Sequence, residues 1–290
     1  MINPLKRVEV NHFTLRHPKV DDRTRNLVVA HVTDIHLGRW VKPRHVEDIA
    51  AYVNRQRVDL AVLTGDYVGY NKSDLAPCIE ALDKLDVPAF ATLGNHDHWA
   101  STELAEAAFA RSAVSMLSNR SLSFTTHRGH ALRIIGVDDA VTGHDDVAGS
   151  FAEATDDLLR LTLCHVPALA PQLSEAGADL MFSGHTHGLQ FNVPGVARLL
   201  ESRLGVKYIG GGYEVGGTLL YVSRGLGSAS WPWRFRAAPE LAFFTLQPGH
   251  RPELILDHRL QTTIAHAPNH RARRLLPAAR ATTPSPGEDL

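Results

Sequence analysis

The chain has few cysteines and no excess charge of either sign. Only two of its 290 residues are cysteine, Cys78 and Cys164. Two thiols cannot make a disulfide framework or a zinc site built on thiolate pairs, so a reducing compartment is the simpler expectation. With 30 basic and 31 acidic residues, the formal net charge is -1. That balance gives no electrostatic case for a nucleic-acid partner.

Long apolar runs are also missing from the sequence. No stretch approaches the roughly 20 apolar residues that a membrane-spanning helix needs. The first ten residues show neither the apolar core of a signal peptide nor a twin-arginine pair. We therefore expect a soluble, cytoplasmic chain with no transmembrane segment, for which peripheral contact with a membrane stays open. The hydrophobic fraction of 44% suits a globular protein with a sizeable core.

Apolar runs alternate with amphipathic segments in the first half of the chain. This pattern predicts strands at 27–33, 58–64 and 87–93, and helices at 43–56, 73–86 and 101–112. Three strand–helix repeats imply parallel strands joined by right-handed crossovers. Ligand sites in such sheets lie at the carboxyl ends of the strands, which is where Asp34, Asp66 and Asn95 fall.

The second half of the chain predicts more strands and fewer helices. An antiparallel pair is expected at 122–126 and 131–137, a short helix at 167–177, and further strands at 158–164, 179–183, 218–223, 241–246 and 254–258. Residues 5–15 are predicted as an edge strand. The whole pattern indicates an α/β fold of two packed sheets flanked by helices. We expect one domain over residues 1–261 and a disordered tail over 262–290, which lack periodicity.

Five short motifs, each at the end of an apolar run, contain side chains that can bind metal or handle phosphate. They are Asp34-Ile35-His36, Gly65-Asp66, Gly94-Asn95-His96-Asp97, Cys164-His165 and Gly184-His185-Thr186-His187. Taken singly, each has an ordinary explanation as a loop or turn, and a lone histidine such as His165 is usually structural. Together they indicate a metal site. Carboxylate, amide and imidazole donors without thiolate suit Mn²⁺, Fe or Zn²⁺.

Spacing within two of the motifs suggests how the ions are shared. Residues i and i+2 of an extended strand point to the same side. Asp34 and His36 are therefore expected to reach one ion. His185 and His187 have the same spacing, and could face one ion or two.

The order of the motifs across residues 27–188 resembles that of the calcineurin-like metallophosphoesterases. Residues 220–227 and 238–241 resemble the YkuE/YaeI-type branch of bacterial phosphoesterases. The resemblance implies a four-layer αββα fold, a two-sheet β-sandwich flanked by helices. It also implies a dinuclear phosphohydrolase in which a metal-bridging hydroxide attacks phosphorus in line.

The resemblance further implies a role for each motif residue. One ion would be held by Asp34, His36 and His187, the other by Asn95, His165 and His185, and Asp66 would bridge the two. His96 would not bind metal but would lie beside the phosphoryl group and either stabilise charge or protonate the leaving oxygen. Asp97 would orient His96 by accepting its other ring proton. The two divalent ions are expected to be Mn²⁺, with Fe or Zn²⁺ as alternatives.

The sequence leaves the substrate open. The activity is expected to be that of a phosphodiesterase or pyrophosphohydrolase, and the substrate a small-molecule or lipid-linked phosphoester. A UDP-2,3-diacylglucosamine pyrophosphohydrolase-like activity is one alternative, because apolar residues recur at helical spacing within 194–208, although core packing also explains them. A catalytically silent binding scaffold is another. Candidate substrate contacts, for which packing is the competing explanation, are Arg39, Trp40, His98, Trp99, Trp231 and Arg234.

Overall fold

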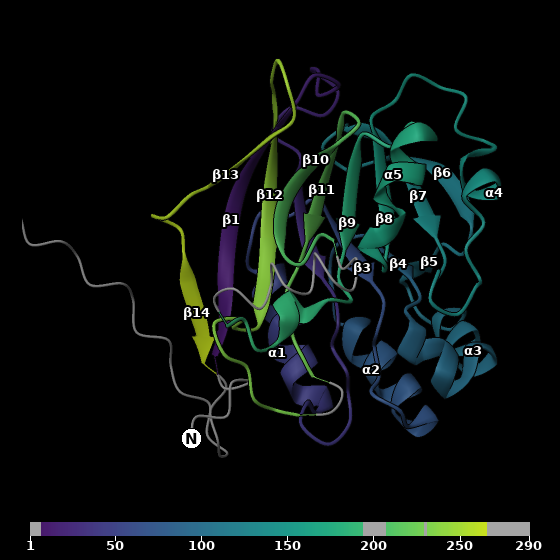
Figure 1. Ribbon diagram of the computed structural model, residues 1–290, viewed down its shortest axis with the longest axis vertical. Coiled ribbons are helices and arrows are strands. Elements are labelled where there is room, and N and C mark those ends of the chain that lie inside the picture. The colour runs from purple at the N-terminus through teal and green to yellow at the C-terminus, as the bar shows by residue number, and fades with distance from the viewer. Residues whose placement is uncertain (1–6, 194–206, 229–230, 266–290) are drawn as a thin grey trace, which may run out of the picture.

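The computed structural model describes residues 7–193, 207–228 and 231–265 (Figure 1). Its strands are β1 (Arg7–His17), β2 (Val28–Val32), β3 (Leu60–Thr64), β4 (Ala89–Thr92), β5 (Ser115–Met116), β6 (Arg120–Thr125), β7 (Ala131–Val137), β8 (Arg160–Cys164), β9 (Leu180–Ser183), β10 (Gly211–Val215), β11 (Thr218–Val222), β12 (Glu240–Pro248), β13 (Glu253–Leu256) and β14 (Thr262–Ala265). Its helices are α1 (Pro43–Asn54), α2 (Leu75–Leu82), α3 (Asn95–Phe109), α4 (Val147–Phe151) and α5 (Ala170–Glu175), with short 3₁₀ turns η2 (Lys72–Asp74), η3 (Pro167–Leu169) and η4 (His187–Leu189).

These strands form two sheets. The 8-stranded sheet has the order β13-β1-β12-β2-β3-β4-β5, with β14 beside β1, and the 6-stranded sheet has the order β10-β11-β9-β8-β7-β6. Strands β2 to β5 run parallel, as predicted for the first half of the chain. Strands β7, β8, β9 and β11 are parallel as well. Each sheet therefore collects several carboxyl strand ends at one edge.

The layers follow from the alternation of side chains along the strands. On β3, Leu60 and Val62 pack between the two sheets, whereas Ala61 and Leu63 pack toward the helices. A third buried cluster lies between the 6-stranded sheet and α5. Figure 1 shows α1, α2 and α3 grouped together, away from α4 and α5. The predicted fold, two packed sheets with helices outside, is confirmed.

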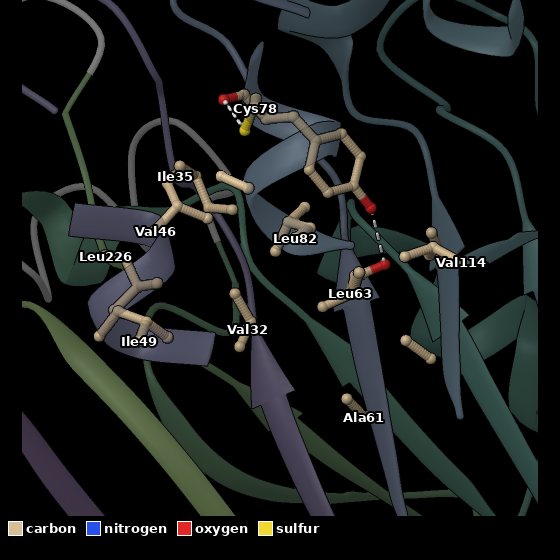
Figure 2. Packing of buried hydrophobic residues seen from close by; sticks show 14 of the residues in the cluster. Val32, Ile35, Val46, Ile49, Ala61, Leu63, Cys78, Leu82, Val114 and Leu226 are labelled. Atoms are coloured by element: carbon tan, nitrogen blue, oxygen red, sulfur yellow. Dashed lines mark hydrogen bonds between the residues drawn. The ribbon is translucent and has the colours of Figure 1, made fainter. Parts of the chain in front are cut away.

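Helix α1 fixes the segment that leaves β2. Its buried residues recur at helical spacing and include Val46 and Ile49. Figure 2 shows these two side chains close to Ile35 and Leu226 in the same buried cluster. Ile35 lies between the first two metal-binding candidates of the sequence, so the packing of α1 holds that motif in place.

Three predictions about the elements are wrong, one about the position of a strand in its sheet and two about where elements begin. Strand β1 is not an edge strand, because β12 pairs with it on one side and β13 and β14 on the other. Residues 262–265, expected to begin the disordered tail, form β14 beside β1. Helix α3 begins at Asn95 rather than near residue 101, with a non-helical break at Ser101 (φ 177, ψ 116). The Gly94–Asp97 motif therefore occupies a helical turn.

Two further sequence expectations concern membranes and apolar residues. Within the described ranges, no helix is long and apolar enough to cross a membrane. The sequence also predicts apolar residues at helical spacing within 194–208. Residues 194–206 of this segment lie outside the described residues.

Candidate metal centre

The seven predicted metal ligands lie where strands of both sheets end. The 8-stranded sheet contributes the residues that follow β2, β3 and β4, and the 6-stranded sheet those that follow β8 and β9. Most are fully buried, and those after β9 are half-buried. In chain order, the seven are Asp34, His36, Asp66, Asn95, His165, His185 and His187. The predicted convergence of distant segments is thus confirmed.

One group of donors gathers around His36. Its Nε2 lies 3.0 Å from Nε2 of His187, which in turn lies 3.4 Å from Oδ1 of Asp34. Donor atoms about 2.1 Å from one ion, at angles of about 90–110°, lie about 3.0–3.4 Å apart. The spacings of 3.0 Å and 3.4 Å fit this geometry, whereas Nε2 of His36 and Oδ1 of Asp34 are 4.0 Å apart, which corresponds to a wider angle at the ion. With that wider angle, these three side chains can hold one ion.

A second group gathers around His165. Its Nε2 lies 3.3 Å from Nδ1 of His185. Asn95, which precedes His96 in the first turn of α3, is 3% exposed, and its Oδ1 has no hydrogen-bond partner among the described residues. Leaving a buried amide oxygen without a partner is unfavourable, by about 1–3 kcal/mol. A metal ion would satisfy this oxygen, so the residues present fit a second ion.

Asp66 lies between the two groups. A single oxygen, Oδ2, is 3.4 Å from Nε2 of His36 and 3.3 Å from Nε2 of His165. Its other oxygen, Oδ1, accepts a hydrogen bond of 3.0 Å from the backbone N–H of His96. The hydrogen bond from His96 fixes the orientation of Asp66. Its Oδ2 lies close to two histidines, one following a strand of each sheet.

Backbone carbonyls set the orientation of two histidines. Nδ1 of His36 contacts the carbonyl of Val68 at 3.2 Å, and Nδ1 of His165 contacts that of Thr64 at 2.7 Å. Because a carbonyl oxygen can only accept, each Nδ1 carries the proton. In the neutral form of each ring, Nε2 then presents a lone pair to the centre of the site, as a metal-binding histidine requires.

The electrostatics of the site favour cation binding. Burial lowers the pKa of His36 to about 3 and that of His185 to about 4, so both imidazoles are neutral near neutral pH. Burial raises the pKa of Asp34 to about 6. Although burial opposes its charge, His165 next to Asp66 has its pKa raised to about 10. Metal binding would therefore displace a proton from His165.

Five of the candidate ligands occupy unusual backbone conformations. Asp34, His36, Asp66, His185 and His187 have φ of 50°, 47°, 56°, 71° and 52°. Non-glycine residues in this left-handed region cost about 1–2 kcal/mol each, and such strain is concentrated at functional sites. Extended-strand alternation is therefore not what pairs Asp34 with His36, and His185 and His187 belong to different groups.

Two glycines let the strand ends approach each other. A Cβ at Gly94 would overlap Oδ1 of Asp66, and a Cβ at Gly184 would overlap Oδ2 of Asp34. Any larger residue at either position would push a carboxylate out of the site. Close packing around these two carboxylates thus explains Gly94 and Gly184.

His96 lies at the same centre. Its Nδ1 makes a short hydrogen bond to the carbonyl of Gly69, which holds the ring. A donor atom of His96 lies within 4.8 Å of those of His36 and Asp66, so proximity alone does not separate it from the ligands. The aromatic rings of Tyr70 and Trp99 also contact the His96 ring.

Asp97 does not orient His96, contrary to the prediction. Its two carboxylate oxygens accept hydrogen bonds of 2.8–3.0 Å from the backbone N–H groups of Gly94, Asp66 and Tyr67. Burial, together with the charge of Asp66, raises the pKa of Asp97 to about 7. Asp97 ties the first turn of α3 to the segment after β3, and the partner of the His96 ring is Gly69.

Arg234 also differs from its prediction as a substrate contact. Its guanidinium donates to the carbonyls of Arg224, Gly227 and Ala237. Its Nη2 lies 2.9 Å from Nδ1 of His187. Arg234 therefore fastens its own loop against a metal-ligand candidate, a role that the sequence pattern did not indicate.

Of the other predicted substrate contacts, some pack against the protein and others are exposed to solvent. Trp40 packs on the core cluster of α1, and the guanidinium of Arg39 lies 4.7 Å from its ring. Nε2 of His98 is 2.8 Å from Asp138 at the end of β7, so its side chain is engaged between α3 and the second sheet. Trp231 is 67% exposed in the loop that contains Arg234. Among the six candidates, Trp99 is the one whose side chain contacts His96.

Tyr70 is the site residue that the sequence analysis missed. It follows directly on Gly69, whose carbonyl holds His96, and it is 61% exposed with its ring against His96. A tyrosine four positions after Asp66 is the available sequence signal, but nothing in the sequence alone shows that this loop reaches His96.

Comparisons with known proteins agree with this geometry. A family model described as calcineurin-like phosphoesterase matches residues 27–189. The uncharacterized metallophosphoesterase YkuE of Bacillus subtilis (strain 168) is 28% identical over 247 residues, covering 83% of this chain and 86% of that protein. Phosphodiesterase YaeI of Escherichia coli (strain K12) is 29% identical over 231 residues, covering 78% and 84%.

A solved structure shares the fold. The crystal structure of a dimetal phosphatase from Danio rerio matches with a TM-score of 0.50 and 12% identity, covering 84% of this chain and all of that one. At this identity the likeness concerns the fold alone. The family match spans more than half of the chain and includes every motif of the site. The chain therefore belongs to the calcineurin-like phosphoesterase family and is a metal-dependent phosphoester hydrolase.

Proposed function

We propose that the chain is a dinuclear phosphohydrolase that acts on phosphodiesters or pyrophosphates. The observation that carries the proposal is the position of Asp66, whose Oδ2 lies within 3.4 Å of histidine nitrogens from both donor groups. A single carboxylate oxygen between two such groups is what a shared ligand of two ions requires. The unpartnered oxygen of Asn95 supports the second ion.

The ligand assignment follows the two groups. Asp34, His36 and His187 would hold one ion, Asn95, His165 and His185 the other, and Asp66 both. When bound, two divalent ions would acidify a water molecule and offset negative charge on the phosphoryl oxygens.

The donor types favour Mn²⁺, with Fe or Zn²⁺ as alternatives. Carboxylate, amide and imidazole side chains make up the two groups. Cys164, the neighbour of His165, lies in a buried apolar cluster, and burial raises the pKa of its thiol. A buried, protonated thiol is a poor ligand, which leaves the site without a soft donor.

His96 is the residue that we assign to proton transfer. The carbonyl of Gly69 accepts from Nδ1 of His96, so a second, transferable proton resides on Nε2 in the imidazolium form. That proton would pass to the ester oxygen as it leaves phosphorus. The backbone N–H of His96 holds Asp66 at the same time, so the acid and the shared ligand are positioned by one residue.

A panel of phosphoesters tests the proposal. The purified protein is loaded with Mn²⁺ and assayed with p-nitrophenyl phosphate, bis(p-nitrophenyl) phosphate and a nucleoside diphosphate ester, and metal is measured in the same sample. The name of one relative, phosphodiesterase YaeI, supports a diester substrate. We expect two metal ions per chain and faster turnover of the diester or pyrophosphate than of the monoester. One ion per chain, or preference for the monoester, would contradict the proposal.

An exposed apolar patch favours a second candidate, a lipid-linked pyrophosphate substrate such as UDP-2,3-diacylglucosamine. The patch consists of Phe191, Val193, Trp231 and Phe235, which are 44–67% exposed. Residues 191 and 235 are joined by a β-bridge, and Arg234 connects the same loop to His187. Apolar side chains grouped on the surface beside an active site suit acyl chains.

The lipid-linked candidate has its own test. The Mn²⁺-loaded protein should hydrolyse UDP-2,3-diacylglucosamine faster than UDP-glucose, because only the former has acyl chains for the patch. Replacing Phe235 and Trp231 by serine should remove the difference and leave bis(p-nitrophenyl) phosphate hydrolysis unchanged. Equal rates for the two UDP compounds in the unmodified protein would rule this candidate out and leave the diesterase proposal intact.

A further inference from the structure

Two solvent-exposed aromatic side chains lie against the His96 ring. Tyr70 is 61% exposed and Trp99 57%. Their ring centroids lie 4.8 Å and 4.9 Å from that of His96, each tilted by 62°. His96 itself is only 9% exposed. The rings thus form a rim beside His96 that is open to solvent on one side and touches the site on the other.

The chain segments that place His96 also place this rim. Tyr70 follows Gly69, whose carbonyl holds Nδ1 of His96. Trp99 comes three residues after His96 in α3, and residues with this spacing are neighbours on a helix surface. Neither ring belongs to the three buried apolar clusters of the described residues. Core packing therefore does not account for these two aromatic residues.

We propose that Tyr70 and Trp99 form a subsite for a flat aromatic group, such as a nucleobase, on the ester-oxygen side of the substrate. The inference rests on the proposed function, which puts that oxygen beside Nε2 of His96. The group attached to the oxygen then meets the two rings that contact His96. A base stacked on aromatic side chains typically gains about 5- to 150-fold in affinity.

The chemistry of the rim favours a planar group over an acyl chain. Aromatic faces match other flat rings at low entropic cost, because Tyr and Trp have only two side-chain torsions. The exposed aliphatic and aromatic patch of Phe191, Val193, Trp231 and Phe235 lies instead in the segments joined to His187 through Arg234. The two features therefore flank different histidines of the site.

Binding of two matched phosphate monoesters tests the subsite. Adenosine 5′-monophosphate and ribose 5-phosphate share phosphate and sugar and differ only in the base. Calorimetric titration of the Mn²⁺-loaded protein should give at least about tenfold tighter binding for the nucleotide. Trp99→Leu and Tyr70→Leu should each remove most of this advantage without weakening ribose 5-phosphate. Trp99→Phe should retain it.

Trp231→Leu serves as the matched control, because Trp231 is an exposed tryptophan that is not in the rim. It should leave the preference for the nucleotide unchanged. Equal affinity of the unmodified protein for the two ligands would overturn the subsite, as would a Trp99→Leu variant that loses affinity for both equally. If bis(p-nitrophenyl) phosphate is still hydrolysed, only the subsite is wrong. If neither ligand binds and no ester is hydrolysed, the proposed function fails as well.

Discussion

At the scale of single residues, Asp66 is the side chain on which both proposed ions depend. Its Oδ2 is close to His36 and to His165, whereas Asn95 is assigned to one of the two proposed ions only. We expect Asp66→Ala to reduce the metal content from two ions per chain to none, because each ion loses a charged ligand. Asn95→Ala should retain one ion. Elemental analysis after gel filtration checks this, and two ions in Asp66→Ala would refute the shared role.

His96 is expected to affect catalysis without affecting metal content. It holds its proton-donating position through Gly69, and its removal leaves the seven ligands in place. We expect His96→Ala to lower kcat for bis(p-nitrophenyl) phosphate by about 10²–10⁴-fold, the usual contribution of a positioned acid. Metal content should stay at two. A variant that loses one ion instead would show that His96 is a ligand, as its proximity to His36 and Asp66 allows.

At the scale of elements, Asp97 connects helix α3 to the end of β3. Four buried backbone N–H groups, those of Gly94, Asp66, Tyr67 and Val68, share its carboxylate. Asp97→Ala would leave them without an acceptor, which we expect to lower the free energy of unfolding by about 3 kcal/mol or more. Glu103→Ala, on the exposed part of the same helix, should change it by less than about 0.5 kcal/mol. Urea unfolding in EDTA separates this effect from metal loss.

The limits of the sequence prediction are visible at the same scale. Apolar runs located β2, β3, β4, β8 and β9, and the residues after them were therefore assigned to one site. Spacing could not show that Asp97 accepts from the backbone after β3, or that Arg234 reaches His187 from a loop 47 residues away in the chain. These contacts depend on how the two sheets pack and on left-handed turns, which local propensity does not encode.

At the scale of the whole molecule, His31 lies between the two sheets. It is fully buried on β2, bonds Thr64, and faces the rings of Phe182 and Tyr221 from the second sheet. Burial lowers its pKa to about 3. Below about pH 6.5 the unfolded chain binds a proton that the folded protein does not, so stability falls by about 1.4 kcal/mol per pH unit down to about pH 3.

A variant at this position tests the pH dependence. His31→Gln keeps a polar side chain but cannot titrate, so its free energy of unfolding should fall less between about pH 7 and about pH 4.5 than that of the unmodified protein, by about 2–3 kcal/mol. Urea unfolding of metal-free samples at the two pH values measures the difference. Parallel pH dependence in the two proteins would show that His31 does not titrate in this way.

Metal binding should stabilise the sandwich as a unit, because each proposed ion takes ligands from both sheets. Asp34 and His36 follow β2 of one sheet, whereas His187 follows β9 of the other. Burial is the main cause of the raised pKa of Asp34, and without metal the negative charge of Asp66 raises this pKa further. Ions at a thousandfold excess over their Kd add about 4 kcal/mol per site.

For a chain of this size, 1 kcal/mol corresponds to about 2–4 °C in Tm. We therefore expect EDTA to lower the Tm of the Mn²⁺-loaded protein by about 10 °C or more. The Asp66→Ala variant, which should bind neither ion, should show no such change. Ions that bound one sheet only would stabilise local structure, and the thermal transition would then split in EDTA, with one sheet unfolding first. A single transition that shifts as a whole is the result that two ions bound between the sheets require.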